Sequence, residues 1–258
     1  MSNYPQQLIK WLFDLIFPKT CLGCGKFTNS RADFDYVCRK CFGGIGLKDK
    51  LECIGCKRQT KLGLTCMSCK DKNNIDQLLI AAELSDPLVN KMIKAYKYGF
   101  IFDMFLPLTV IAKKSVKKLL RKDFNLLEDN PLFIPVPLYR TRLNERGFNQ
   151  SWLITKSMAD AFHVSSDEHA LSKKHNFKHQ ADTKSREERL NNIKGNFVLS
   201  DPYGVNGRTI ILVDDICTTG ATLNECAKVL KNPPAGGGAK RVIGFVIARG
   251  QFKQISNL

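Results

Sequence analysis

Long apolar runs are missing from this 258-residue sequence. Residues 4–17 are the nearest candidate for a membrane segment. However, Lys10 and Asp14 interrupt them, the stretch is shorter than the roughly 20 residues that span a bilayer, and no small-residue cleavage site follows. Apolar residues recur there at helical spacing, which predicts an amphipathic helix that packs onto the protein or lies on a membrane surface. We therefore expect a cytoplasmic protein, with peripheral contact at the inner face of the membrane as the alternative.

Two further absences narrow the function. No Gly-x-x-x-x-Gly-Lys-[Ser/Thr] sequence occurs, so the chain is not itself an ATP-driven motor of the P-loop kind. The four histidines, as a set, do not have the spacing of metal ligands.

Acidic residues are also few, since 24 Asp and Glu face 40 Lys and Arg and leave a net charge of +16. The excess is spread along the chain: residues 1–70 hold 12 basic and 5 acidic residues, and residues 71–258 hold 28 and 19. A charge of this sign and size predicts a polyanionic partner. A soluble basic surface without such a partner is the alternative.

Cysteine, by contrast, is abundant. Eight of the ten cysteines form four Cys-x-x-Cys pairs, namely Cys21 with Cys24, Cys38 with Cys41, Cys53 with Cys56, and Cys66 with Cys69. Each pair directs two thiolates at one point, and two pairs complete a tetrahedral set of four sulfurs, which suits zinc. A disulfide scaffold would need an oxidising compartment, and nothing in the sequence predicts export.

The simplest pairing of these cysteines is sequential, so that the first four bind one zinc ion and the last four bind another; a cross-braced pairing stays open. Four thiolates leave no open coordination position, so the sites are expected to be structural. The segment is short and poor in apolar residues, and metal binding would therefore supply its folding free energy. We assign residues 1–72 to the amphipathic helix and this zinc module.

Basic and aromatic side chains surround the cysteine pairs. The basic ones would contact nucleic-acid phosphates or dock another protein. Four aromatic residues would either stack nucleobases or fill the small core of the module: they are Phe27, Phe34, Tyr36 and Phe42. A second basic run, between Lys113 and Lys122, lies on a predicted helix and is either a nucleic-acid track or a solvated face.

From residue 73 to residue 258 the pattern changes to strands that alternate with helices, which predicts an α/β fold with a parallel sheet. Strands are expected at 77–83, 132–136, 209–213 and 241–248, and helices at 86–98, 102–121, 149–162 and 221–230. Asp86 and Pro87 have the sequence of a helix start. Residues 171–194 are polar and lack apolar periodicity, so we expect a long mobile loop there.

The segment Ile210–Thr222 carries the clearest chemistry. Asp214 and Asp215 follow a buried strand, at the edge of the sheet where α/β proteins bind ligands. The residues after them open a helix, whose free N–H groups and dipole favour a phosphate: they are Thr218, Thr219, Gly220, Ala221 and Thr222. Two carboxylates beside a phosphate site suit a ribose diol with Mg²⁺. A purely structural acidic turn is the alternative.

Cys217 lies close to this helix terminus, which would lower the pKa of its thiol. A nucleophilic role is one interpretation of that position, and a small residue of the loop is the other. Cys226 is expected in the core.

The same segment resembles the phosphoribosyl-pyrophosphate signature of type I phosphoribosyltransferases. Other stretches are similar to the ComF competence family: 135–138, 142, 146–150, 94–99, and the run 180–197, together with the four preceding cysteine pairs. The resemblance covers nearly the whole chain. It implies a type I phosphoribosyltransferase-like sheet flanked by helices, preceded by a double zinc-ribbon module.

The resemblance also implies residue roles. Asp214 and Asp215 would hold the ribose hydroxyls of phosphoribosyl pyrophosphate (PRPP), and Cys217–Thr222 the 5-phosphate. The turn after the 132–137 strand, with Pro137 and Leu138, matches the pyrophosphate loop. Lys97 and Arg146 would meet the pyrophosphate or an anionic substrate, and the 171–194 loop would close over the centre.

ComF proteins are similar in role to cytoplasmic factors that receive single-stranded DNA during natural transformation. The resemblance therefore implies a competence factor that binds PRPP with Mg²⁺ and single-stranded DNA, with a DNA-translocating helicase and other competence proteins as candidate partners. The alternatives are a phosphoribosyltransferase of nucleotide salvage, for which the sequence shows no hood segment, and a protein-docking module on an inactive enzyme fold. Whether the chain catalyses a transfer, and to which acceptor, stays open.

Overall fold

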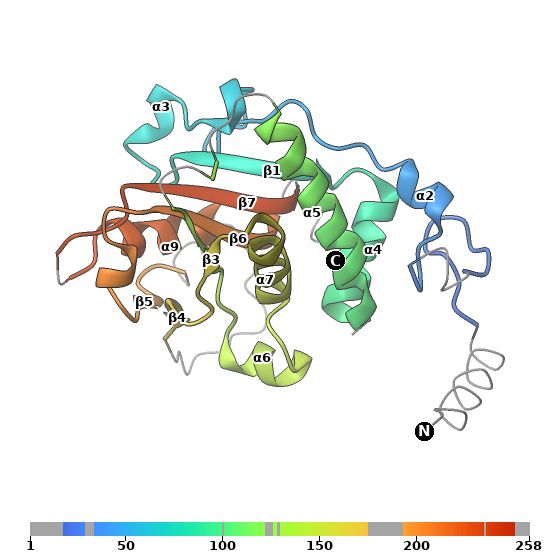
Figure 1. The fold of residues 1–258 in the computed structure, drawn as a ribbon. Helices are drawn as coiled ribbons and strands as arrows, with labels where there is room; N and C mark the ends of the chain where they lie inside the picture. Colours follow the sequence, from blue (N-terminus) through green and yellow to red (C-terminus); the bar gives the residue numbers. More distant parts are fainter. Residues whose placement is uncertain are drawn as a thin grey trace.

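The computed structural model describes residues 18–28, 34–99, 101–121, 126–127, 130–174, 193–234 and 236–250. Within these ranges, the centre is a five-stranded sheet of order β1-β7-β6-β2-β3 (Figure 1). The strands are β1 (Gln77–Glu83), β7 (Arg241–Arg249), β6 (Thr209–Cys217), β2 (Leu132–Pro135) and β3 (Ser165–Ser166). Every neighbouring pair runs parallel, which confirms the expected sheet.

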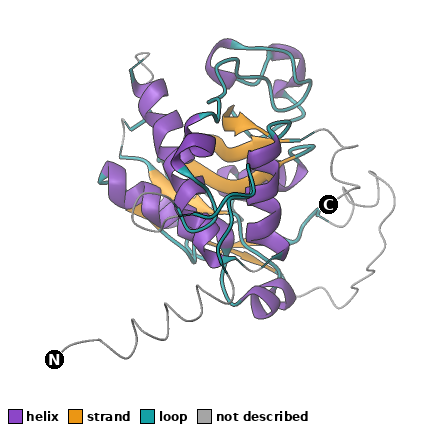
Figure 2. Ribbon diagram, turned by 90° about the vertical axis from the view of Figure 1, so that its right-hand side faces the viewer, coloured by secondary structure: helices purple, strands orange, loops and turns teal. Residues whose placement is uncertain are grey.

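Helices cover both faces of this sheet, and Figure 2 shows the strands between them. Helices α5 (Phe105–Leu120) and α7 (Gln150–Phe162) pack together on one face, with α4 (Pro87–Tyr98) beside α5. Helix α9 (Ala221–Lys231) lies against β6 and β7 on the other face (Figure 1). Because both faces are covered, β6 and β7 are almost continuously apolar and buried, as the sequence predicts for central parallel strands.

Local signals set the helix ends. Asp86 accepts hydrogen bonds from the backbone N–H groups of Leu88, at 2.8 Å, and Val89, at 3.1 Å, and Pro87 occupies the first turn. This confirms the helix start predicted at Asp86 and Pro87. Helix α5 follows a 3₁₀ turn, η2 (Phe102–Met104), so the expected 102–121 helix is found in two parts.

Several short elements were not predicted. Helix α6 (Arg140–Arg146) precedes α7, and β4 (Leu171–Lys173) pairs antiparallel with β5 (Phe197–Leu199) in a separate small sheet. The prediction of a loop from residue 171 is therefore wrong for residues 171–173, because the buried Leu171 pairs with Leu199. Residues 175–192 of that loop, and the helix expected over 4–17, lie outside the described residues.

The remaining short elements are α2 (Arg39–Gly43), η1 (Lys61–Gly63), α3 (Met67–Lys70) and η3 (Tyr203–Val205). The second and last cysteine pairs lie far apart: α2, which contains Cys41, is beside α4 and α5, and α3, which contains Cys69, is at the opposite end of β1 (Figure 1). None of the helices in the described ranges combines the length and the apolar character needed to cross a membrane.

The cysteine-rich segment is joined to the sheet through edge strand β1. Leu47 forms an antiparallel bridge with Ala82, and Leu64 forms another with Gln77. The backbone N–H of Lys48 donates to Ala81 at 2.9 Å. The buried Leu51 and Ile54 belong to the same apolar cluster as the β1 side chains. The boundary at residues 72 and 73 stays a prediction, but Leu51 and Ile54 of the cysteine-rich segment pack into the core of the sheet.

The turn at Gly63 gives a direct test of this packing. Gly63 has φ +79°, and a Cβ on it would lie 2.1 Å from the carbonyl oxygen of Leu78 in β1. Gly63→Ala should therefore lower the free energy of unfolding by more than about 2 kcal/mol, since a left-handed L-residue alone costs about 1–2 kcal/mol. Urea unfolding measures this difference.

The matched control is Gly46→Ala, because a Cβ on Gly46 meets nothing within 4 Å. That change should stay within about 0.5 kcal/mol of the parent protein. Equal unfolding curves for the two variants would contradict the close contact between this turn and β1.

Candidate functional site

Asp214 and Asp215 lie where β6 extends beyond the end of the neighbouring strand β2. The pairing of β2 with β6 ends at Pro135 and Val213, whereas β6 continues with β7 as far as Cys217 and Arg249. The strand that was expected to end at Val213 is therefore four residues longer, because β7 continues to pair with it. Asp214 and Asp215 lie on this extension, at the carboxyl end of the sheet, as the sequence predicts.

Three elements converge on the two acids. The Oγ of Ser151, in the first turn of α7, donates to Oδ1 of Asp214 at 3.0 Å, and the backbone N–H of Asp215 donates to the same oxygen at 2.9 Å. From the last turn of α4, the ammonium of Lys97 lies 2.8 Å from Oδ1 of Asp215. Lys97, which the resemblance assigns to the pyrophosphate or an anionic substrate, thus lies against the acidic pair.

Burial and charge set the protonation of this cluster. Burial, followed by the negative charge of Asp215, raises the pKa of Asp214 to about 7, even though Lys97 and Ser151 oppose the shift. Burial alone would lower the pKa of Lys97, but the carboxylates of Asp215 and Asp214 outweigh it and raise that pKa. Near neutral pH, Asp214 can therefore accept or release a proton while Lys97 stays charged.

The segment after β6 has the geometry of an anion loop. Gly220 has φ +82° and precedes the first turn of α9, and the backbone N–H of Ala221 donates to Oγ1 of Thr219 at 3.3 Å. Helix α9 has eleven residues, so its dipole and its first N–H groups favour a negative group at this end. Thr218, Thr219 and Thr222 are each partly exposed there.

Cys217 does not have the ionisation expected of it. It is the last residue of β6 rather than part of the α9 terminus, and its side chain is buried. Burial raises the pKa of its thiol to about 11. The expected lowering is therefore wrong, which argues against a nucleophilic thiol. Cys226 is fully buried in α9, as predicted.

The turn after β2 and the residues after α6 form the opposite side. Pro137 is buried and Leu138 partly so, and the side-chain amide of Asn149 donates to the carbonyl of Val136 at 3.2 Å. Arg146 donates to Oε1 of Gln150 at 3.0 Å.

Gln150 lies directly before Ser151, so Arg146 is connected to the acidic pair through the first turn of α7. Among the described residues, the buried Nε2 of Gln150 has no hydrogen-bond partner.

Sequence analysis missed one cation beside this site. Lys173, in β4, holds its ammonium 3.6 Å from the ring centroid of Tyr139 and 5.1 Å from that of Phe197. Burial lowers the pKa of Lys173 to about 8, and Asp214 is one of the charges that oppose this shift. Nothing in the sequence indicated this position of Lys173, because β4 and β5 are too short to show periodicity. Ser151 was missed because only the fold brings α7 to β6.

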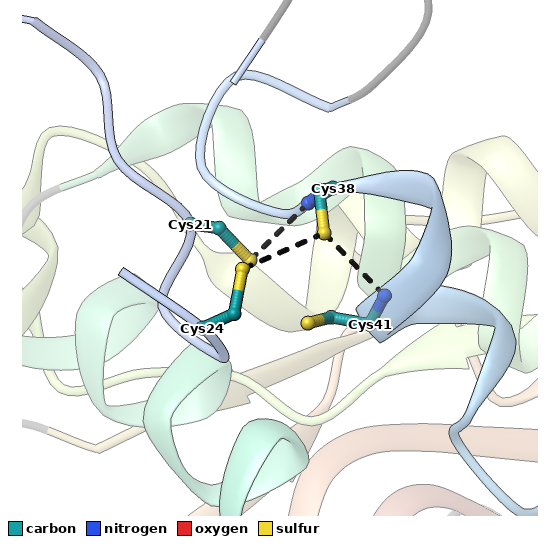
Figure 3. Close-up of side chains that lie close together, drawn as sticks. All are labelled: Cys21, Cys24, Cys38 and Cys41. Atoms are coloured by element: carbon teal, nitrogen blue, oxygen red, sulfur yellow. Dashed lines mark hydrogen bonds between the residues drawn. The ribbon is translucent and has the colours of Figure 1, made fainter. Parts of the chain in front are cut away.

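The eight paired cysteines form two separate clusters among the described residues. One contains Cys21, Cys24, Cys38 and Cys41, and the other contains Cys53, Cys56, Cys66 and Cys69. Within each cluster the sulfurs all lie within 4.8 Å of one another. The sequential pairing is therefore confirmed, and Figure 3 shows the first cluster.

Both clusters fit a tetrahedral metal. The Sγ atoms of Cys24 and Cys38 are 3.9 Å apart, and those of Cys56 and Cys66 are 3.7 Å apart. Zn–S bonds of about 2.3 Å in a tetrahedron place the sulfurs about 3.8 Å apart. A Cβ on Gly23 would lie 2.9 Å from Sγ of Cys41, so the turn leaves room only for the sulfurs.

Hydrogen bonds favour the thiolate form at some of the sulfurs, whereas side-chain hydrogen bonds with Cys38 and Cys66 raise the pKa values of Cys41 and Cys69. Burial raises the pKa of Cys21, but backbone N–H groups of Cys38, Cys24 and Gly23 outweigh it and lower the pKa to about 6. The Arg58 side chain lowers the pKa of Cys56 to about 6. Thiolates are the form that binds zinc, so both clusters could hold a structural zinc ion.

Most aromatic residues of the cysteine-rich segment pack internally. Phe34 and Phe42 form an edge-to-face pair with centroids 4.8 Å apart, and Tyr36 lies under the Lys19 ammonium at 5.7 Å. Of the four predicted, Phe27 alone is largely exposed, at 74%. Phe27 is therefore the most accessible of the four residues for which base stacking was expected.

Some basic residues at the end of α5 also make contacts within the protein. Lys118 forms an ion pair with Asp49, and Lys114 lies 5.0 Å from the Phe42 ring centroid. The same helix face thus holds the cysteine-rich segment in place.

Comparison with known proteins places the chain in a family, although no family model matches it. Competence protein F of Haemophilus influenzae is 27% identical over 219 residues, covering 77% of this chain and 92% of that protein. Competence protein ComFC of Bacillus subtilis is 28% identical over 215 residues, covering 83% and 84%. DNA utilization protein YhgH of Escherichia coli is 30% identical over 183 residues, covering 70% and 78%. The chain belongs to the ComF competence family.

In this ComF protein, Lys97 and the acidic pair, which the resemblance singled out, meet at the carboxyl end of β6. Lys97, Ser151 and the acidic pair are in direct contact, and the Gly220 loop continues from the same strand. The cysteine pairs that precede them in the sequence form the two clusters.

Zinc content tests the cluster assignment. Freshly reduced protein should contain about two zinc ions per chain, because each set of four thiolates completes one tetrahedron. Cys24→Ser and Cys56→Ser, which change one exposed ligand in each cluster, should each reduce this to about one zinc ion. Elemental analysis together with native mass spectrometry gives the count. Protein without zinc would show that these cysteines are not a metal site.

Proposed function

We propose that the protein is a competence factor that binds PRPP at the carboxyl end of β6 and handles incoming single-stranded DNA in the cytoplasm. The names of two relatives, Competence protein F and Competence protein ComFC, support a role in competence. The observation that carries the ligand proposal is the combination on one strand of an acidic pair and a glycine loop that opens α9.

Each part of PRPP has a matching group in this arrangement. The 5-phosphate would bind the N–H groups of residues 217–222, and the ribose hydroxyls would donate to Asp214 and Asp215. Mg²⁺, where it accompanies the ligand, needs oxygen ligands, which these carboxylates supply. The pyrophosphate would be bound by Lys97, Arg146 and the Pro137–Leu138 turn.

Lys97 would change partner when the ligand binds. It is paired with Asp215 at 2.8 Å, and both side chains are largely buried. A pyrophosphate group carries more negative charge than one carboxylate and competes for the ammonium, while the ribose hydroxyls or Mg²⁺ replace it at Asp215. The exchange leaves no buried charge unpaired, as the low dielectric of the site requires.

A phosphoribosyltransferase of nucleotide salvage is the second candidate function. It is favoured by the small β4–β5 sheet, which supplies a covering element that sequence analysis did not find. Lys173 on that sheet would face an acceptor. Release of pyrophosphate from PRPP with any free nucleobase would establish this activity, whereas binding without release supports a ligand-sensing or structural role.

The DNA proposal is supported by charge rather than by a defined groove. The net charge is +16, and the exposed lysines of the cysteine-rich segment include Lys26, Lys40 and Lys70. The α5 tail offers a second track, reduced by the contacts of Lys114 and Lys118. A DNA-translocating helicase, other competence proteins and a membrane surface are proposed as partners on the resemblance alone.

PRPP with Mg²⁺ should raise the melting temperature of the protein. At a ligand concentration about 100 times Kd, binding adds about 2.7 kcal/mol to the folded state. The double change Asp214→Asn with Asp215→Asn should abolish the shift, since both carboxylates are lost. Differential scanning fluorimetry gives the shift, and titration calorimetry gives the affinity.

Two controls make this result specific. Asp214→Asn alone keeps the ion pair between Lys97 and Asp215 and should still weaken binding. Asp160→Asn changes an exposed acid that pairs with Lys156, and it should leave the response intact. A double variant that responds like the parent protein would place the ligand elsewhere.

Single-stranded DNA should bind without sequence preference and with an affinity that falls steeply with salt. Each neutralised phosphate contributes a log–log slope of about −0.7 on single strands. If the cysteine-rich segment is the track, the triple change of Lys26, Lys40 and Lys70 to Ala should flatten the slope by about 2. Fluorescence anisotropy over a range of salt concentrations measures it.

Two matched triple variants complete this test. Changing Lys113, Lys114 and Lys117 to Ala probes the α5 tail and keeps the ion pair of Lys118 with Asp49. Changing Lys156, Lys228 and Lys240 removes the same charge from α7, α9 and the start of β7. If all three variants change the slope equally, DNA binding depends on net charge and not on a defined track. An affinity that does not depend on salt would contradict the DNA proposal.

A further inference from the structure

The two cysteine clusters begin with the same four-residue pattern but lie against different parts of the protein. The first knuckle is Cys21-Leu22-Gly23-Cys24, and the second is Cys53-Ile54-Gly55-Cys56. Leu22 is partly exposed, and its carbonyl accepts a hydrogen bond from Lys91 of α4 at 2.9 Å. Ile54 is fully buried and belongs to the main core.

The second knuckle contacts the anion loop directly. A Cβ on Gly220 would lie 2.7 Å from Cγ1 and 2.9 Å from Cδ1 of Ile54, so the loop backbone rests on this side chain. Gly220 is the residue at which the chain turns from β6 into α9, with φ +82°. Any movement of Ile54 therefore changes the space that fixes this turn.

A buried arginine fastens the same knuckle to the end of the sheet. Arg249, the last residue of β7, donates to the carbonyl of Cys53 at 3.0 Å and to that of Ile54, and it pairs with Glu52 at 3.0 Å. Its side chain is 2% exposed.

Arg249 also pairs in register with Cys217, the residue before the loop, and Gly250 donates to the carbonyl of Cys217 at 3.0 Å. The knuckle and the anion loop are thus held by one set of contacts.

We infer that Ile54 and Arg249 are positioning residues for the proposed phosphate site, and that the second cysteine cluster, but not the first, holds residues 217–222 in their binding conformation. The inference rests on the proposed function for its ligand. Its physical basis is that backbone N–H groups bind an anion only when they point at it together, and here one side of the loop is fixed by Ile54 while the other faces the ligand.

The consequence is a dependence of ligand affinity on one metal site. Loss of a ligand from the second cluster would free the knuckle and let the Gly220 turn move. Loss of one from the first cluster would disturb only its contacts with α4 and α5. The two clusters thus have different roles, although their sequences are alike.

Hydrogen exchange tests the conformational part without any ligand. In Ile54→Ala, the backbone amides of residues 217–222 should exchange about tenfold faster than in the parent protein, since local opening becomes easier. Leu22→Ala is the matched control, because it truncates the same position of the other knuckle. Both variants must keep their full zinc content. Unchanged exchange in Ile54→Ala would overturn the inference whether or not PRPP binds.

Calorimetry on the same full-length variants tests the functional part. Ile54→Ala should weaken PRPP and ribose 5-phosphate about tenfold, a usual size for coupling between two sites. Inorganic pyrophosphate, which lacks the 5-phosphate, should bind both proteins alike, and Ile54→Val should restore most of the affinity. Equal weakening of all three ligands would indicate general destabilisation and contradict a positioning role.

The cluster variants separate the two metals. Cys56→Ser should weaken PRPP binding and Cys24→Ser should not, at a temperature where both proteins are folded. If the parent protein binds no PRPP, the proposed ligand is wrong, and the exchange of residues 217–222 still decides the inference. If both cysteine variants bind PRPP as the parent does, the dependence on the second cluster is wrong.

Discussion

The parallel pairing of β6 with β7 beyond the end of β2 is the constraint on which the site depends. It carries Asp214 and Asp215 beyond the end of β2, so β6 still pairs with β7 at these acids but no longer with β2. It also brings Arg249 level with Cys217, where it can hold the second knuckle. If β2 paired with β6 along its whole length, β2 would cover the two acids. If β6 instead ended with β2 at Val213, the Gly220 loop would lose its support from Arg249.

The cysteine-rich segment therefore packs against the rest of the protein and is not a separate attachment. Its second half packs into the core through Leu51 and Ile54, whereas its first half is held on α4 and α5 by contacts such as Lys91 with the carbonyl of Leu22 and Lys114 with Phe42. A segment this short cannot bury enough apolar area to fold alone, so metal binding and docking onto the sheet both contribute to its stability. The family relationship is consistent with this continuity, because the alignment with ComFC covers 83% of the chain.

Sequence reasoning located the sheet, the long helices, the cysteine clusters and the acidic pair, because each depends on local patterns: apolar runs, Asp86 with its proline, and repeated Cys-x-x-Cys spacing. It missed α6, β4 and β5, whose lengths are too short for periodicity to show. It also missed Ser151, Lys173 and Arg249, which reach the site only through strand order and helix packing. Cys217 was misjudged because burial, a property of the fold, outweighs the local effect of a helix terminus on its pKa.

The ion pair between Lys97 and Asp215 has a consequence for selectivity. With its charges balanced, the pair itself adds little attraction for a simple anion, because an anion that captured Lys97 would leave Asp215 alone in a poorly hydrated place. A diol without a negative group meets the opposite difficulty, since it would displace Lys97 and give it no counter-ion. A molecule that presents an anion together with hydroxyls, or an anion with its own cation, at the right separation would exchange with both partners at once. The pair would therefore weaken the binding of fragments relative to the whole proposed ligand.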